Sequence, residues 1–220
     1  MYRYYIEDKN HVPPFNEPAS LLTIGTRPLK LHQEELIAAM FGNSIELGGV
    51  LDDIGDLRTV QGESVVYRDN LWFDREFFEY FIKLARASGR ACQAAFPVDD
   101  KAFKTYVVPL AQDITKSVTP SGQPVYLLQL WYFPHGYTDD IMPMEQGDLT
   151  HFAPMRAVMS VESWVHVYFA SIIFSNFARA GRLDRKIGQS VFTSLRLLWH
   201  AIKEQKQVLQ ASGAVEIGKN

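Results

Sequence analysis

The clearest pattern of apolar and polar positions lies in residues 64–98. The apolar run from Val65 to Tyr67 predicts a short buried strand. Polar and apolar residues then alternate with a helical period in "DREFFEYFIKLARASG", where Asp74 is placed to cap a helix and Gly89 to end it. The apolar face of this helix comprises Phe77, Phe78, Phe81, Ile82 and Ala85. The apolar run "ACQAAFPV" follows, so the segment predicts a strand–helix–strand unit with a right-handed crossover.

Other apolar segments extend this pattern on both sides. "YRYYI" at residues 2–6 predicts a first strand, and the proline-rich "EDKNHVPPFNEPAS" predicts a loop. "LHQEELIAAMFG" predicts a helix with Leu31, Leu36 and Met40 on its inner side. "FKTYVVPL" and "PVYLLQLWYFP" predict two more strands, of which the long apolar second one is typical of a central strand. We therefore expect an α/β fold, a Rossmann-like mixed sheet with flanking helices, over residues 1–153.

The pattern becomes helical after residue 153. Residues 160–180 are apolar nearly all round, which predicts a helix, capped by Ser160, that is buried or faces a membrane. Residues 187–210 have the stripe of an amphipathic helix. We expect residues 154–213 to be a helical linker segment.

The last residues, 214–220, contain "VEIGKN", which has the pattern of one rung of a hexapeptide-repeat β-helix. A single rung cannot bury its apolar side, because roughly three or more are needed for a stable stack. We therefore interpret this segment as the start of a truncated β-helix.

Composition narrows the class of protein. In 220 residues, 47% are hydrophobic and 13% aromatic, which favours a packed core over disorder. The single cysteine, Cys92, excludes an internal disulfide framework and a multi-cysteine zinc site. A reducing compartment fits this cysteine usage, and the N-terminus lacks the apolar run of a signal peptide. We expect a cytoplasmic protein.

Charge is unevenly distributed along the chain. Residues 1–155 hold 13 Lys and Arg against 21 Asp and Glu, whereas residues 156–220 hold 9 against 4. The basic part has two interpretations: it meets an anionic surface such as a membrane, or it complements the acidic front part. We expect no nucleic-acid partner, because no aromatic-interleaved RNA motif or zinc-finger spacing is present.

Three short segments carry candidate chemistry. Asp69 directly follows a predicted buried strand, where a carboxylate can bind a divalent cation that bridges phosphate oxygens, although it can equally cap the next turn. Arg27 and Lys30 precede a helix start, which suits a phosphate, and the alternative is a solvated turn. His135 lies in a Pro-His-Gly turn as a candidate base, metal partner or substrate contact, and the alternative is an ordinary surface histidine.

Two of these segments resemble sugar-1-phosphate nucleotidyltransferases. "RPLKLHQEEL" resembles the Pro-Leu helix start after the nucleotide loop of that family, and "VVYRDNLWFDREFFEYFIKLARASGRACQAAFPV" resembles the next unit. Arg68-Asp69 stands where the family has a Gly-Asp pair. The resemblance implies Mg²⁺ on Asp69, phosphate contacts from Arg27 and Lys30, and a sugar phosphate or nucleotide as the small-molecule partner.

The order of segments is similar to bifunctional N-acetylglucosamine-1-phosphate uridyltransferases, in which a helical linker leads to a left-handed β-helix acyltransferase domain. The chain departs from the family at the glycine-rich nucleotide loop, because "DKNHVPPFNEPAS" contains no glycine. Two alternatives to a nucleotidyltransferase therefore stay open. One is a non-catalytic assembly or regulatory domain for a homo-oligomeric β-helix, and the other is a peripheral membrane module attached through residues 160–207.

Overall fold

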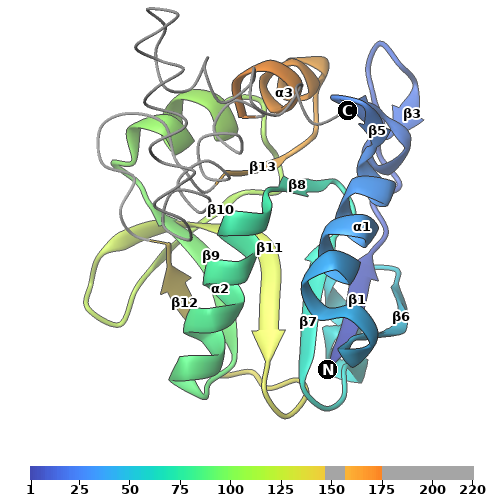
Figure 1. The fold of residues 1–220 in the computed structure, drawn as a ribbon. Helices are drawn as coiled ribbons and strands as arrows, with labels where there is room; N and C mark the ends of the chain where they lie inside the picture. The colour runs from blue at the N-terminus through green and yellow to red at the C-terminus, as the bar shows by residue number, and fades with distance from the viewer. Residues whose placement is uncertain (147–156, 175–220) are drawn as a thin grey trace, which may run out of the picture.

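A seven-stranded mixed sheet forms the centre of the computed structural model, which describes residues 1–146 and 157–174 (Figure 1). Across the sheet the strands are β12 (Met142–Glu145), β9 (Cys92–Pro97), β11 (Pro124–Phe133), β7 (Ser64–Arg68), β1 (Tyr2–Ile6) and β6 (Glu46–Leu51), with β10 (Thr115–Val118) paired to β11. Strand β11 is antiparallel to β7, β9 and β10, whereas β6, β1 and β7 are mutually parallel. With the flanking helices α1 (Leu29–Phe41) and α2 (Arg75–Ser88), this architecture confirms the predicted α/β class.

Short elements connect the main ones. The two-residue pairs are β2 (His11–Val12) with β3 (Glu17–Pro18) and β4 (Thr23–Ile24) with β5 (Arg27–Pro28). Short 3₁₀ turns are η1 (Ala19–Leu21), η2 (Gly42–Ser44) and η3 (Ile54–Thr59). A separate two-stranded sheet pairs β8 (Leu71–Phe73) with β13 (Val158–Ser160).

Both long helices cover the same face of the sheet. Successive residues of β7 alternate between the faces, so Val65 and Tyr67 pack with α1 and α2, while Val66 packs on the other side. That other side is covered by η3, whose Leu57 is buried there. The sheet is therefore a buried layer, and its strand ends are the places where polar side chains can gather.

The unit β7–α2–β9 has the predicted form. Asp74 caps α2, its Oδ1 accepting a hydrogen bond of 2.7 Å from the amide of Phe77. Gly89 ends the helix with φ of 63°, the left-handed conformation that glycine adopts at low cost. Local signals in the sequence suffice for this unit because cap, period and stop all lie within it.

Two predicted segments differ from the structure. "FKTYVVPL" forms a one-turn π-helix, η4 (Phe103–Val107), and the strand prediction is wrong. The turn is favoured because Asp100 accepts a 2.7 Å hydrogen bond from the Phe103 amide, and the Phe103 ring stacks on Phe96 at 4.4 Å between centroids. In α1 the buried positions are Leu29, Gln33 and Ile37, whereas Leu31 is exposed.

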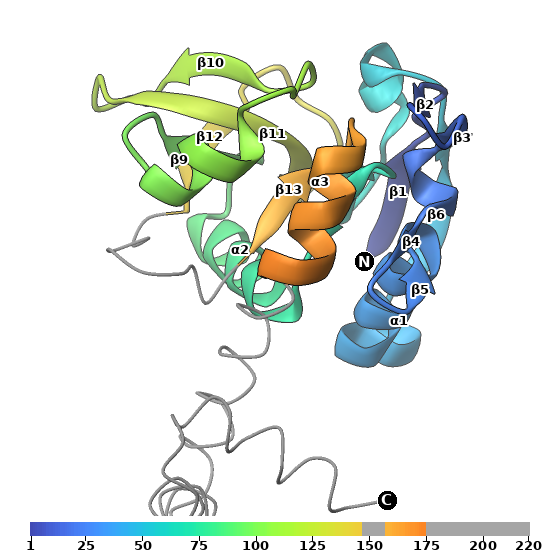
Figure 2. The same cartoon turned by 90° about the horizontal axis from the view of Figure 1, so that it is seen from above.

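The described part of the predicted helical linker packs with the sheet domain. Ser163, rather than Ser160, caps α3 (Trp164–Tyr168), because Ser160 is the last residue of β13. The chain continues into a π-helix, η5 (Phe169–Phe174), whose Phe174 belongs to the main core. Figure 2 shows α3 between the side of the domain that carries β9 and β11 and the side that carries α1.

The outward side of this helical segment is apolar. Trp164, Tyr168 and Ile172 recur every four residues and are more than half exposed. No helix in residues 1–146 and 157–174 is long and apolar enough to cross a bilayer. Attachment to a membrane surface stays a prediction, and the amphipathic segment 187–210 and the tail 214–220 lie outside the described residues.

The glycine pair in β6 yields a stability prediction. A Cβ on Gly48 would lie 2.3 Å from Cζ of the largely buried Tyr4 ring, whereas a Cβ on Gly49 would meet the same ring at an ordinary 3.6 Å. Gly48→Ala is therefore expected to lower the free energy of unfolding by about 1–3 kcal/mol, since it overpacks a fitted site. Gly49→Ala is the matched control, and urea unfolding that gives both variants the same midpoint would contradict this.

Candidate functional site

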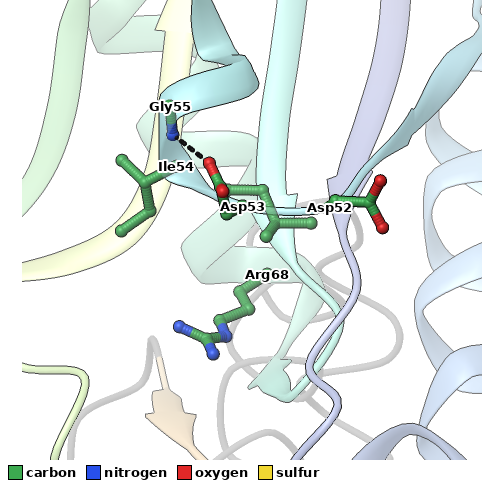
Figure 3. Close-up of a pocket in the computed structure, with 6 residues that line it drawn as sticks. Asp52, Asp53, Ile54, Gly55 and Arg68 are labelled. Carbon is green, nitrogen blue, oxygen red and sulfur yellow. Dashed lines mark hydrogen bonds between the residues drawn. The ribbon is translucent and has the colours of Figure 1, made fainter.

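A pocket of about 270 Å³ lies where β1, β6 and β7 end (Figure 3). Its lining residues are Ile6, Asp52, Asp53, Ile54, Gly55 and Arg68. Figure 3 shows Asp53 and Ile54 on one side of it and Arg68 on the other. Ligands of open α/β sheets bind beyond the carboxyl ends of the strands, so this pocket is the first candidate for a binding site.

Arg68 joins the pocket to a group of polar side chains, which we call the Arg68 cluster: Asp8, Arg68, Asn70, Asp113 and Gln129. The guanidinium Nη2 of Arg68 donates to Asp8 Oδ1 at 3.0 Å. Its Nη1 donates to Asp113 Oδ1 at 3.0 Å and to Gln129 Oε1 at 3.1 Å. The Asp8 side chain is only 4% exposed, and those of Arg68 and Asp113 are 16% exposed. These ion pairs are therefore shielded from water and are stronger than surface pairs.

Asn70 completes the Arg68 cluster from a second direction. Its Nδ2 donates to Asp8 Oδ2 at 3.0 Å and to Asp113 Oδ2 at 2.9 Å. Each of the two carboxylates is thus held by one guanidinium nitrogen and by the Asn70 amide. The cluster thus combines two anions and one cation with the side-chain amides of Asn70 and Gln129, and Asp8 Oδ1 also accepts from Asn10.

The pairing of β1 with β7 places these residues together. Ile6 is the register partner of Arg68, so the residues that follow both strands emerge side by side. The Asp69 amide donates to the Ile6 carbonyl at 3.0 Å, and Asp69 Oδ1 accepts from the Asp8 amide at 2.8 Å. Burial raises the pKa of Asp69 to about 6, although the hydrogen bond from the Asp8 amide acts in the opposite direction.

Gln33 of α1 stabilises the segment that connects β7 with β8. Its Nε2 donates to the Asp69 carbonyl at 3.1 Å and to the Leu71 carbonyl at 2.7 Å, although Gln33 is 1% exposed. Buried backbone carbonyls need such partners. Gln33 is thus polar on the inner side of α1 because it supplies the hydrogen bonds that these two backbone carbonyls need.

The other predicted contact residues have separate positions. Arg27 pairs with Glu35 of α1, and both side chains are about half exposed. Lys30 donates to the hydroxyl of Tyr5 at 3.3 Å, and this hydrogen bond is the main reason that its pKa is raised. The charge of Asp69 makes a smaller contribution to the raised pKa of Lys30, so of the predicted residues these two share an electrostatic environment.

His135 lies apart from Asp69. It follows β11, and because that strand is antiparallel to β7, its final residue Phe133 pairs with Ser64, the first residue of β7. Asp69 follows the last residue of β7, so the length of that strand separates the two positions. A single site around Asp69 does not include His135, which is exposed in its turn.

The side chains present do not fit the Mg²⁺ that the resemblance implies. In the described part of the chain, no three side chains of the carboxylate, imidazole or thiolate type converge as metal ligands. Asp69 uses Oδ1 to accept the Asp8 amide, and the carboxylates of Asp8 and Asp113 bind Arg68. No catalytic step through a metal is therefore derived from this arrangement.

Sequence reasoning singled out none of the five members of the Arg68 cluster as a site residue. Asp8 follows its strand as Asp69 does, so the rule applied to Asp69 also points to it. Asn70 is next to a predicted residue but is not acidic. Asp113 and Gln129 carry no local signal, because only the pairing of β11 with β7 brings Gln129 to Arg68.

A buried histidine anchors the loop that supplies Asp113. His166 Nε2 donates to the Pro109 carbonyl at 2.8 Å, and its Nδ1 accepts from the Glu162 amide at 3.1 Å. The Glu162 carboxylate in turn accepts from the amide of Gln112, and from that of Asp113 at 3.3 Å. The residues at the start of α3 therefore hold Asp113 in its place in the Arg68 cluster.

This histidine gives a pH prediction. Burial lowers the pKa of His166, although the hydrogen bond that its Nε2 donates to the Pro109 carbonyl acts in the opposite direction. A histidine that is neutral when folded and protonated when unfolded makes the protein lose stability as the pH falls through its unfolded pKa of about 6.5. The loss between pH about 7.5 and about 5.5 is expected to be smaller in His166→Asn than in the wild type.

Thermal unfolding at both pH values measures this difference. The acidic residues connected to His166 by hydrogen bonds are Glu162 and, through it, Asp113. Burial raises the pKa of Glu162, so the contribution of Glu162 has the opposite sign. Those contributions are present in both proteins, so the comparison isolates the imidazole. An equal pH dependence in the variant and the wild type would show that His166 is not the group responsible.

Comparison with known proteins identifies no family for the chain. No family model matches it, and no curated protein matches it. A solved chain described as a glucose-1-phosphate thymidylyltransferase from Bacillus anthracis, in complex with a sucrose, is similar at a TM-score of 0.48 and 10% identity. The similarity covers 79% of this chain and 94% of that chain. A similarity at this TM-score and sequence identity says nothing about which ligand this chain binds.

Proposed function

We propose that this chain is a diverged nucleotidyltransferase-like domain that binds a sugar 1-phosphate or a sugar nucleotide in the pocket that Arg68 lines. The observation that carries the proposal is the state of Arg68 Nε. This nitrogen is buried, and among the described residues nothing accepts its hydrogen bond. A buried donor without a partner is costly, and an anionic oxygen is the acceptor that suits a guanidinium best.

The pocket walls suit a sugar beside that anion. Ile6 and Ile54 offer apolar contact, while Asp52 and Asp53 offer carboxylate oxygens to hydroxyl groups. Lys9 pairs with Asp52 at 2.8 Å and adds a positive charge near the pocket. A volume of about 270 Å³ is near the low end of the range for small-molecule pockets and is suited to one sugar ring.

Titration calorimetry with glucose 1-phosphate and with uridine- and thymidine-diphosphate sugars tests the proposal. Arg68→Gln is expected to weaken binding by at least about tenfold, which is the usual worth of a hydrogen bond to a charged group. Arg90→Gln is the matched control, because Arg90 pairs with Asp140 on the surface, away from the pocket. Lys9→Gln, which changes an exposed residue, is expected to weaken binding by less. An absence of heat with every ligand would refute the proposal.

The second candidate function is binding without nucleotidyl transfer, in an assembly or regulatory domain. The engagement of both cluster carboxylates by Arg68 favours it, because it leaves them unavailable to a metal. In this case binding persists, but pyrophosphate release from a nucleoside triphosphate and a sugar 1-phosphate is absent. Measured turnover that depends on Asp69 would exclude this second candidate.

A further inference from the structure

We infer that the guanidinium of Arg68 occupies the place of a divalent cation, so that the site is neutralised from within the chain. The ligand-binding part of this inference rests on the proposed function, and the metal-binding part does not. We attribute the poor fit between the implied Mg²⁺ and the observed side chains to one residue, Arg68.

Three side-chain oxygens surround the guanidinium of Arg68. Asp8, Asp113 and Gln129 each direct one oxygen at the guanidinium, at 3.0 to 3.1 Å from its nitrogens. Two carboxylates and a neutral amide oxygen are the kind of ligand set that a hard divalent cation accepts, with water completing the shell. The planar fork of an arginine reaches two carboxylates at once, which a single ammonium on a flexible stem does less well.

Asn70 binds the remaining oxygens of the two carboxylates. Its Nδ2 contacts both carboxylates, while its Oδ1 is buried without a hydrogen-bond partner among the described residues. The opposite amide orientation would bring Oδ1 against two anionic oxygens, so this orientation is the only favourable one. The amide thus takes up the second oxygen of each carboxylate, and the set of anions is satisfied without a metal.

Removal of the guanidinium should therefore uncover a cation site. In Arg68→Met the side chain keeps much of its volume, but Asp8 and Asp113 lose their countercharge. Two neighbouring carboxylates without a countercharge attract a divalent cation strongly. The variant is expected to bind Mn²⁺ saturably, whereas any binding to the wild type should be at least about tenfold weaker and should not saturate over the same concentration range.

Mn²⁺ titration followed by electron paramagnetic resonance tests this on the full chain. Arg90→Met is the matched control and should behave as the wild type. A folded Arg68→Met protein that gains no Mn²⁺ binding would overturn the inference. One saturable Mn²⁺ on the wild type, lost in Asp8→Asn, would overturn it too, and this measurement needs no arginine variant if Arg68→Met fails to fold.

A second measurement addresses the ligand. Glucose 1-phosphate should bind the wild type with the same affinity in excess chelator and in Mg²⁺. Binding that requires Mg²⁺ would overturn the inference while leaving the proposed function intact. An absence of binding in both conditions refutes the proposed function alone, because the Mn²⁺ titrations still decide whether Arg68 holds the cation position.

Discussion

Arg68→Met is expected to lower the free energy of unfolding by about 3–5 kcal/mol in the absence of divalent metal, the usual cost of breaking a buried ion pair from one side. The cost arises because the side chain of Asp8 is only 4% exposed, so its carboxyl group would be left buried without the cation that pairs with it. Urea unfolding with chelator present measures the loss, and the exposed Arg90→Met should stay within about 0.5 kcal/mol of the wild type.

A second variant separates charge from packing. Arg68→Met combined with Asp8→Asn removes the more deeply buried of the two uncompensated anions and should recover a large part of the lost stability. If the double variant is as unstable as Arg68→Met, the loss came from the packing of the long side chain instead. Mn²⁺ should also restabilise the single variant, and it should not affect the wild type.

Phe78→Ala is expected to cost about 3–5 kcal/mol, the usual range for removing a buried aromatic ring. Phe78 is fully buried between the helix and the sheet, its ring stacks on Phe73 at 4.7 Å between centroids, and Phe41 of α1 meets it edge-on at 6.4 Å. The substitution therefore opens a cavity at the point where both helices and the connection after β7 meet. Neighbours on β8 and α1 limit how far that cavity can close.

Denaturant unfolding measures this loss, with Phe15→Ala as the matched control. Phe15 lies in the loop after β2 and is 47% exposed, so its removal should change stability by about 0.5 kcal/mol or less. Phe78→Leu preserves most of the volume and should cost under about 1.5 kcal/mol. Equal losses for Phe78→Ala and Phe15→Ala would contradict the packing described here.

The sequence was sufficient wherever the deciding interactions were local. The strand–helix–strand unit was predictable because Asp74, the apolar period and Gly89 act within one segment. The segment after Asp100 was not, because its β-rich composition is outweighed by the stacking of Phe103 on a strand residue, Phe96, that no local pattern reveals.

The candidate site divides in the same way. The position of Asp69 beside Asp8 follows from its place directly after an apolar strand, and Asp8 obeys the same rule. The prediction for His135 rested on its Pro-His-Gly turn, but β11 runs antiparallel to β7, so that turn lies at the opposite end of the strands from Asp69. Strand direction and register are set by long-range pairing, which one sequence does not show.

The position of β11 between β7 and β9 also constrains how the chain folds during synthesis. Strands β7 and β9 and the helix between them leave the ribosome first, yet they do not pair with each other. Among the described strands, β11 joins the two halves of the sheet, so the place between β7 and β9 cannot be filled as in the folded protein until residues 124–133 have been made. Non-local strand pairing of this kind slows folding. The apolar strand edges of β7 and β9 are thus without a partner during that interval, when a nascent chain is most open to capture by chaperones or by other chains.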